Sequence, residues 1–574
     1  MNLQTFFDNF DLLAEAPNGV QKLRELILQL AVQGKLVEQD PEDEPASVLL
    51  KRIRINQARL IKDKVIKRVK DLPAVKPEEV PFGIPESWEW VRLNDVGDWG
   101  AGATPDRKKH EYYDGPVRWF KSGELNDSYI SESEERVSEL ALKNCSLRSN
   151  KPGDVLIAMY GATIGKLAIL ETEATTNQAV CACTCFEGIY NRFLFYILRA
   201  YRDRFTNQGA GGAQPNISRE KIINTIAPLP PLDEQMRIVA KVDELMRLCD
   251  ELEKRQQKRR ETRVHLNNSA LEHLLAANKP EEFNTHWQRI CDNFGFLYDS
   301  PETTGKLRQS ILQLTVQGQI VPQDHNDEPA SVQFDKARDA INVLTEENGL
   351  SEREMTPEDV PYTLPIGWKW ISLGHLVKFI GGSQPAKSKF IYEQREGYTR
   401  LIQIRDFKSD GFQTFVPNEF ANRPFKEDDI MIGRYGPPVF QILRGLKGTY
   451  NVALMKASPI EEVLRKDFLY YLLQEPRIQR TVIAESERTA GQSGVRKELL
   501  HSFIVGLPPL KEQKRIVAKV DELMKLCDAL ETNLNQTQNL SESLTASIIN
   551  YIFSTEENTT ASAAPAHVFV RRRF

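Results

Sequence analysis

The chain repeats itself, and this repetition constrains its fold more than any other feature of the sequence. Residues 22–48 return as residues 306–332, with 19 of 27 positions identical. Residues 229–253 return as residues 507–531, with 21 of 25 positions identical. A chain of 574 residues also exceeds what one hydrophobic core usually organises. The sequence therefore predicts two similar halves that contain the same parts in the same order.

The stretches between these repeats differ between the halves. Residues 98–228 and 379–506 share only short echoes, such as GDVLIAMYG at 153–161 against DDIMIGRYG at 428–436. A duplicated frame with divergent inserts results when two equivalent modules occupy equivalent places but bind different things. We infer one fold with two different surfaces.

Hydrophobic periodicity predicts helices in the repeats and strands in the inserts. In the first repeat, apolar residues at i, i+3, i+4 and i+7 form one helix face that Gly34 can end. These residues are Leu23, Leu26, Ile27 and Leu30. The inserts contain short β-branched runs such as 155–157 and 430–432, punctuated by Gly and Pro, and we expect them to be mainly β.

A long helix is predicted after each insert. Pro230 and Pro231 cannot lie within a helix, and the apolar residues that follow them alternate at spacings of four and three, as in coiled coils. The positions are Ile238, Val242, Leu245, Cys249 and Leu252 in the first helix, and Ile516, Val520, Leu523, Cys527, Leu530 and Leu534 in the second. Roughly 45 residues at about 1.5 Å each give rods of roughly 65 to 70 Å.

Composition excludes some classes of protein without identifying one. With 41% hydrophobic and 27% charged residues and no apolar run long enough for a bilayer, the chain is expected to be soluble. The N-terminus is acidic where a signal peptide needs a basic region, and the seven cysteines are scattered. We expect a cytoplasmic protein without disulfides. The net charge of −5 neither indicates nor excludes nucleic-acid binding, because any basic surface must be local.

Three motifs, in their order along the chain, closely resemble the specificity subunits of type I restriction-modification systems. They are ILQLAVQGKLV-x-QDP-x-DEPAS in the first repeat, GAGATPDRKKHEYYDGPVRWFKSGEL at 100–125, and LPPL-x-EQ-x-RIVAKVDEL before each long helix. The resemblance covers nearly the whole chain. It implies a non-catalytic DNA-recognition subunit that reads a bipartite asymmetric target, with one half-site for each recognition domain and the long helices as a spacer.

The resemblance also implies partners and cofactors. Two modification subunits would carry S-adenosylmethionine and methylate adenine in double-stranded DNA. Restriction subunits would hydrolyse ATP with Mg, translocate and cut. This chain itself is expected to bind no cofactor and no metal.

The predicted architecture is α+β, with two mixed, mainly β target recognition domains joined by two long antiparallel helices and related by a pseudo-two-fold repeat. Because the segment after the first long helix repeats the one that begins the chain, residues 8–70 should pack near residues 540–553. The expected parts are a helical segment at 1–79, a recognition domain at 80–230, a long helix at 231–280, the repeated helical segment at 281–359, the second recognition domain at 360–508, the second long helix at 509–554 and a flexible tail at 555–574.

Two other classes of function are weighed against this one, a stand-alone DNA-modifying enzyme and a coiled-coil scaffold with domains that do not bind DNA. Catalytic motifs are missing: GATIGK at 161–166 lacks the glycine spacing and the Ser or Thr of a phosphate-binding loop. Cys181, Cys183 and Cys185 alternate on an expected strand about 7 Å apart, which favours a half-buried strand over a metal site.

Candidate DNA contacts in the first insert are cations and hydroxyls in a loop before a strand. Arg107, Lys108 and Lys109 lie beside Thr104, and Lys121 and Ser122 follow Trp119-Phe120. Such side chains bind phosphates, and the alternative is a solvated charged turn. In the second insert, Arg400, Gln403 and Arg405 alternate, so we expect Gln403 and Arg405 to share a strand face. Gln pairs with adenine edges and Arg with guanine edges, and the alternative is an exposed polar strand.

Two glycine-rich segments occupy the same place in both halves. They could bring Gln214, Asn216, Gln492 or Ser493 close to a DNA groove, and the alternative is an ordinary glycine-rich turn. The remaining candidates are Tyr160, Lys166, Gln384, Lys387, Arg434, Tyr435 and Arg496.

Overall fold

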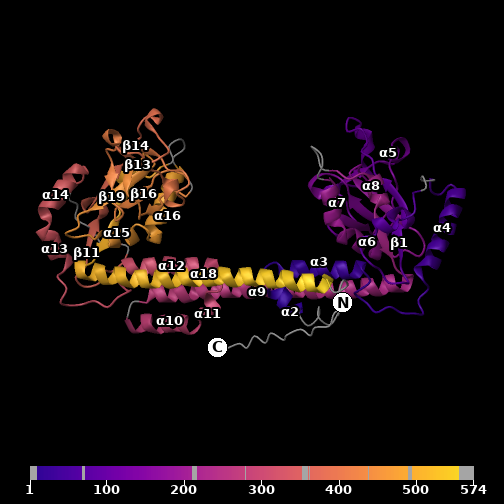
Figure 1. Cartoon of the computed structure of the whole chain (residues 1–574), viewed down its shortest axis with the longest axis horizontal. Helices are drawn as coiled ribbons and strands as arrows, with labels where there is room; N and C mark the ends of the chain where they lie inside the picture. The colour runs from indigo at the N-terminus through magenta and orange to yellow at the C-terminus, as the bar shows by residue number, and fades with distance from the viewer. Residues whose placement is uncertain are drawn as a thin grey trace. The chain divides into compact units, whose positions relative to one another are not determined.

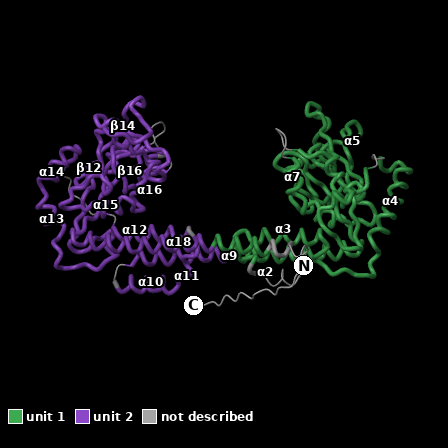
Figure 2. The backbone as a smooth tube through the Cα atoms, in the orientation of Figure 1, with its two compact units in different colours: residues 1–258, 538–574 green, residues 259–537 purple. Residues whose placement is uncertain are grey.

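The computed structural model describes residues 10–67, 72–209, 216–277, 280–351, 360, 362–436, 438–488 and 494–554. The chain divides into two compact units, residues 1–258 with 538–574 and residues 259–537 (Figure 2). Each unit contains one of the divergent inserts. Within the described ranges, no helix is long and apolar enough to cross a membrane.

Unit 1 begins with the helices α2 (Phe10–Glu15), α3 (Gly19–Val32) and α4 (Ala46–Lys62). The predicted apolar face of α3 is buried in the core of the unit, as expected. The turn after α3 requires glycine at position 34, because the φ of Gly34 is +68° and a Cβ there would lie only 2.6 Å from the Pro85 ring. Gly318 repeats this arrangement against Pro365 in unit 2. The first repeat is therefore a helix and turn fitted against the start of the insert.

The insert of unit 1 is mainly β, as predicted. Strands β1 (Glu89–Arg92) and β10 (Ile226–Leu229) pair antiparallel, so the chain enters and leaves the domain on one two-stranded ribbon. Between them lie a five-stranded and a three-stranded sheet. The first has the order β2 (Gly97–Ala101), β9 (Val180–Cys185), β6 (Val155–Ala158), β7 (Leu167–Leu170) and β4 (Ser128–Ile130); the second has the order β5 (Glu135–Val137), β3 (Tyr113–Phe120) and β8 (Thr175–Thr176). Four short helices complete the domain, α5 (Glu139–Asn144), α6 (Asn191–Ala200), α7 (Arg202–Gly209) and α8 (Arg219–Asn224) (Figure 1).

Unit 2 repeats this plan with different details. Its helical segment contains α10 (Pro280–Asp292), α11 (Phe294–Leu297), α12 (Pro301–Val316), α13 (Ala330–Lys336) and α14 (Arg338–Glu347). Strand β11 (Lys369–Ser372) pairs antiparallel with β20 (Ile504–Leu507). One sheet has the order β12 (Val377–Gly381), β19 (Leu454–Pro459), β16 (Ile430–Gly433) and β17 (Ile442–Leu443); the other has β14 (Phe415–Pro417), β13 (Tyr398–Ile402), β18 (Gly448–Tyr450) and β15 (Pro424–Phe425). The helices are α15 (Lys466–Leu472), α16 (Pro476–Arg488) and α17 (Lys497–Ser502).

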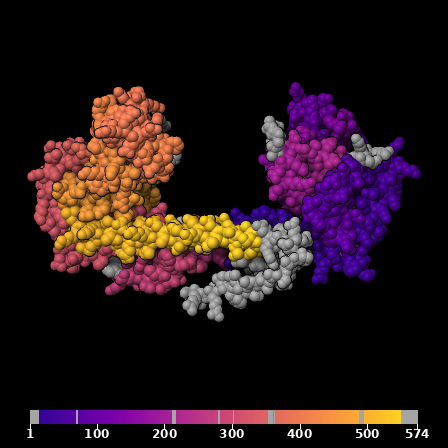
Figure 3. Space-filling model, viewed as in Figure 1, coloured from indigo at the N-terminus to yellow at the C-terminus, as the bar shows by residue number. Residues whose placement is uncertain are grey.

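The long helices are α9 (Leu232–Ala276) and α18 (Leu510–Ser554), each of 45 residues. Helix α9 begins in unit 1 and ends in unit 2, and α18 begins in unit 2 and ends in unit 1. Their predicted apolar positions, except Leu534, lie in or against the cores of the units where the helices begin, for example Val242 in unit 1 and Val520 in unit 2. Exposed residues recur along α18, which is yellow in Figure 3.

The end of α18 belongs to the same unit as the start of the chain. Ile548 packs against the core of unit 1, which includes Leu13 and Leu30 of the N-terminal helices. The end of α18 thus shares a hydrophobic core with the N-terminal helices, in agreement with the expected proximity of the N-terminal segment to residues 540–553.

The first turn of α9 joins three parts of unit 1, and we name this the first-turn joint. The buried Glu234 carboxylate accepts hydrogen bonds from the Trp88 indole N–H at 2.9 Å and from the Gln39 amide at 2.6 Å. The Gln235 side chain accepts from the backbone N–H of Tyr190 at 2.8 Å. Arg237 pairs with the buried Asp43 carboxylate at 2.6 Å. The N-terminal segment, the start of the insert and its interior thus all bond to one helical turn.

Unit 2 repeats two contacts of this joint on α18, but there the Trp368 indole N–H and the Glu512 Oε1 atom have no hydrogen-bond partner among the described residues. The Gln513 side chain accepts from the Arg465 backbone N–H at 2.9 Å, and Arg515 pairs with Asp327 at 2.7 Å. Burial raises the pKa of both Glu234 and Glu512, and the hydrogen bond from Trp88 opposes that shift at Glu234. The first turn of each long helix thereby contacts its own insert and the preceding helical segment.

Trp88→Phe tests the joint. The substitution removes the indole N–H and leaves the buried Glu234 carboxylate with one donor fewer, so the free energy of unfolding of unit 1 is expected to fall by about 1–3 kcal/mol. Denaturant unfolding followed by circular dichroism measures the change. Trp90→Phe is the control, because Trp90 is half-buried against Phe82 and its indole N–H has no hydrogen bond within the described ranges. Equal effects of the two substitutions would contradict the assigned role of Trp88.

Candidate nucleic-acid interface

Lys121 in unit 1 and Gln403 in unit 2 each follow the last residue of a strand, and we name this position the strand-end slot. Strand β3 ends in a 3-10 turn at Ser122–Glu124, and β13 ends in one at Ile404–Phe407. The backbone N–H of Lys121 donates to the Glu124 carboxylate at 2.7 Å, and that of Gln403 donates to the Asp406 carboxylate at 2.6 Å. Each strand also has an antiparallel neighbour on one side and a parallel one on the other. Lys121 and Gln403 are therefore structural equivalents.

The prediction that Gln403 and Arg405 share one face of a strand is wrong. Strand β13 ends at Ile402, because the Asp406 carboxylate caps the backbone at Gln403 and turns the chain into a 3-10 helix. The spacing K-x-x-E at 121–124 and Q-x-x-D at 403–406 is a capping signature, and it could have revealed this turn from the sequence.

In unit 1 the loop before β3 and the end of β3 meet at one carboxylate. Glu135 on β5 accepts from Arg107 at 2.6 Å and from Lys121 at 3.2 Å, and the Arg107 hydrogen bond is the main cause that holds the Glu135 pKa below its ordinary value. The Arg107 guanidinium also lies over the Tyr113 ring, 4.8 Å from its centroid. Arg107 and Lys121 are thus brought together and held in defined positions.

The other candidates of this loop are less constrained. Thr104 hydrogen-bonds Gln178, and Lys109 lies over the Tyr112 ring at 5.3 Å. Lys108 is exposed, and among the described residues neither Lys108 nor Lys109 forms an ion pair. Ser122 is half-buried in the 3-10 turn. The two lysines are therefore exposed cations of this loop without an ion pair among the described residues.

In unit 2 the candidates around the slot differ in availability. The Arg400 guanidinium is mostly buried and pairs with Asp410 at 2.8 Å, which indicates a structural role. The Gln403 amide has only a long contact of 3.4 Å to the Thr414 hydroxyl. Arg405 is exposed, and its guanidinium lies over Phe412, whose side chain is 73% exposed. Phe412 was missed by sequence reasoning, and its signal is an aromatic residue in the polar loop SDGFQ.

The glycine-rich segments are tied to the same neighbouring turn in both units. In unit 1, Tyr160 forms a bridge with Asn216, and both side chains are exposed. In unit 2, the backbone N–H of Val495 donates to the Arg434 carbonyl at 3.1 Å, and Gly494 lies against the ring of Tyr435. Gln214, Gln492 and Ser493 lie outside the described residues. Two exposed tyrosines therefore mark equivalent places.

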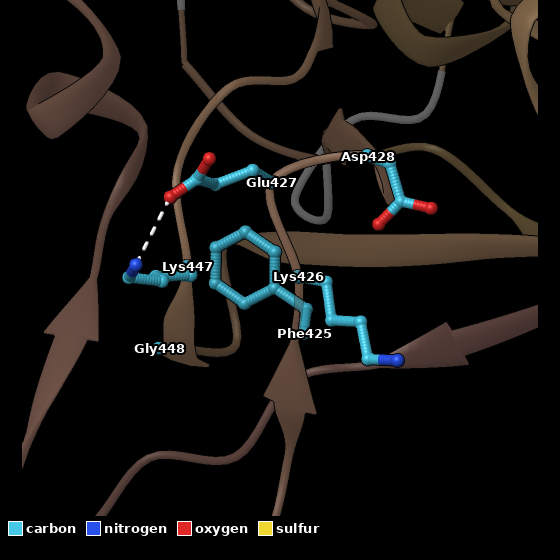
Figure 4. A pocket seen from close by; sticks show the side chains of 6 residues that line it. All are labelled: Phe425, Lys426, Glu427, Asp428, Lys447 and Gly448. Atoms are coloured by element: carbon cyan, nitrogen blue, oxygen red, sulfur yellow. Dashed lines mark ion pairs between the residues drawn. The ribbon is translucent and has the colours of Figure 1, made fainter.

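The remaining candidates lie on separate turns. Lys166, Gln384 and Lys387 are exposed, and Arg496 lies 4.0 Å from the Glu485 carboxylate. A hollow of about 610 Å³ in unit 2 contains none of the candidates. Phe425, Lys426, Asp428 and the ion pair between Glu427 and Lys447 line it (Figure 4). Its mixed charges do not favour an anionic ligand.

The comparison with known proteins decides the family. Residues 85–261 and 365–538 match the type I restriction modification DNA specificity domain, once in each half of the chain. The chain belongs to this family. Both matches include a divergent insert and the first part of the long helix that follows it.

Relatives in the same family align over nearly their whole length. The chain is 29% identical to the specificity subunit of the type I restriction enzyme EcoAI of Escherichia coli, over 93% of this chain and 94% of that one. It is 28% identical to the EcoEI specificity subunit of Escherichia coli over the same shares. The solved HsdS subunit from Thermoanaerobacter tengcongensis aligns at 20% identity with a TM-score of 0.42, covering 83% of this chain and 98% of that one.

Gln403→Ala tests whether the strand-end slot of this specificity domain reads bases. A glutamine amide paired with an adenine edge gives about 1–3 kcal/mol of discrimination, so its loss should relax one base pair of one half-site. Selection of bound sites from a randomised duplex pool measures this. Gln474→Ala is the control, because the Gln474 amide donates to the Tyr470 carbonyl away from the slot. An unchanged base preference for Gln403→Ala would contradict the hypothesis that the strand-end slot contacts bases.

Proposed function

We propose that this chain is the DNA-specificity subunit of a type I restriction-modification complex. It reads a bipartite asymmetric target, and each recognition domain reads one half-site. The observation that carries the proposal is the duplicated family domain whose frame repeats while the strand-end slot changes from Lys121 to Gln403. Two copies of one fold with different reading surfaces fit a target made of two different half-sites.

The chain acts without catalysis of its own. Two modification subunits supply S-adenosylmethionine and adenine methylation, and restriction subunits supply ATP hydrolysis with Mg, translocation and cutting in the cytoplasm. The absence of nucleotide-binding and methyltransferase motifs from the sequence supports this division of labour. The long helices α9 and α18 act as the spacer between the half-sites.

Domain exchange tests the proposal. Replacing residues 98–228 with the corresponding stretch of another specificity subunit should change one half-site and leave the other half-site unchanged, because the divergence between the halves is concentrated in these inserts. The exchanged chain is assembled with its modification subunits, and methylated sites are mapped. A simultaneous change in both half-sites would contradict the assignment of one half-site to each domain.

The purified chain serves as the control in this experiment. Without partner subunits it should neither methylate nor cleave the selected duplex, and it should show no ATPase activity. Methyltransferase activity in a preparation that lacks modification subunits would favour a stand-alone enzyme.

A further inference from the structure

Helix α4 of unit 1 exposes a cationic surface that nothing in the reading of half-sites uses. Its apolar side, formed by Leu49, Leu50 and Ile53, is buried in the core of the unit. Its sequence from Ala46 to Lys62 contains no acidic residue. The helix therefore presents basic side chains to solvent without acidic neighbours on the same helix.

The α4 basic face is defined as Lys51, Arg59 and Lys62 of the helix together with Lys64 just beyond its end, and the exposed Asp63 lies between the last two lysines. All four are exposed, and none of them forms an ion pair among the residues that the structure describes. Arg52 and Arg54 are left out of the face. Arg52 pairs with Glu44 at 2.7 Å, and the charge of Arg54 acts on the Asp95 carboxyl.

The duplicated segment of unit 2 reverses this charge. At the offset of 284 residues that relates the first repeats, Lys51 corresponds to Asp335. At the end of the helix the offset is 285, because Lys64 and Gly349 both have a positive φ and donate the same backbone hydrogen bond, to the Ile61 and Glu346 carbonyls. Lys62 therefore corresponds to Glu347, and Arg59 and Lys64 to the uncharged Leu344 and Gly349. Four positive charges in unit 1 therefore stand against two negative charges in unit 2. A helix that contacts only solvent does not require a charge difference between the two units. A partner that bound both units in the same way would meet opposite charges at the two places.

The chemistry of the face fits a phosphate backbone better than a protein. Helix α4 contains no Trp, Tyr or Phe, the aromatic residues that anchor protein interfaces, and lysine is depleted in such interfaces. Ile55 is exposed among these cations, but single exposed aliphatic residues are ordinary at protein surfaces. Clustered lysine and arginine without acids are typical of non-specific contacts to DNA phosphates.

The α4 basic face is separate from the strand-end slot of the same unit. The buried side of α4 belongs to the main core of unit 1, whereas Trp119 and Phe120, which precede the slot, belong to two smaller clusters. Figure 1 shows α4 beside β1, while α5, which packs against β3, lies toward the far end of the domain. The face therefore lies apart from the candidate base contacts.

We propose that the α4 basic face binds the DNA backbone outside the half-site read by unit 1, and that unit 2 makes no equivalent contact. The inference rests on the proposed function. It gives the complex an asymmetric footprint, with a longer protected flank on one side of the bipartite target than on the other.

The test measures the DNA affinity of the complex with modification subunits, for proteins that differ in the charges of α4 and for duplexes that differ in flank length. The variant Lys51→Gln, Arg59→Gln, Lys62→Gln and Lys64→Gln keeps good helix formers in α4 and removes four charges. Each lost phosphate contact lowers the slope of log affinity against log salt by about 0.9, so the four substitutions should reduce it by about 2 to 4. Trimming the flank beside the unit 1 half-site should weaken wild-type binding by about tenfold or more in low salt and leave the variant unaffected. Trimming the opposite flank should affect both proteins equally.

Two matched variants keep the test specific. Lys336→Gln with Arg338→Gln removes two cations of the unit 2 segment, which pair with Glu328 and Asp335, and should leave the salt slope unchanged. Lys51→Arg with Lys62→Arg and Lys64→Arg should keep the wild-type slope.

The outcomes separate this inference from the proposed function. An unchanged slope in the glutamine variant, or equal flank effects on both sides, would overturn the inference. Failure of the glutamine variant to assemble with modification subunits would assign the face to a protein partner instead. If the wild-type complex did not prefer a bipartite duplex over a scrambled one, the proposed function itself would fail.

Discussion

The side chains on the first turn of each long helix make the contacts on which the rest of each unit depends. Glu234 and Glu512 lie next to a glutamine that bonds the interior of the insert, and one turn before an arginine paired with the preceding repeat. An unpaired buried carboxylate is costly, so the bonds of Glu234 favour the arrangement in which helix, insert and helical segment are all in place. Residues that build these contacts, among them Gln235 and Arg237, are identical in the two halves, whereas the inserts diverge.

A fixed frame leaves the inserts free to change their surfaces. The strand-end slot illustrates this, because the same capped turn carries Lys121 in one unit and Gln403 in the other. The local backbone depends on Glu124 and Asp406, not on the residue presented. The residue at the slot can therefore change without loss of the local fold.

The sequence was sufficient to predict the duplication, the mainly β inserts, the long helices and the packing of the end of α18 with the N-terminal helices, because each leaves a periodic or repeated pattern. It was insufficient at the strand-end slot, where alternation along LIQIRD suggested a longer strand and the Asp406 cap ended it at Ile402. Ion pairs such as Arg107 with Glu135 and Arg400 with Asp410 join residues 28 and 10 positions apart, and no local pattern announces them. The charge reversal between α4 and the matching segment of unit 2 was visible in the sequence, but only the structure shows that the cations of α4 are exposed and without ion pairs.

The central claim is that α9 and α18 set the distance between two reading domains. The direct measurement adds one heptad to each helix, between Ile238 and Ala276 in α9 and between Ile516 and Ile549 in α18, and selects methylated sites from a randomised duplex pool. One heptad preserves the apolar spacing and lengthens a helix by about 10 Å, which corresponds to about three base pairs. The account predicts unchanged half-sites separated by a longer gap, with reduced activity because the added DNA rotates one half-site by roughly a third of a turn. Unchanged half-sites separated by the original gap would show that something other than these helices measures the distance.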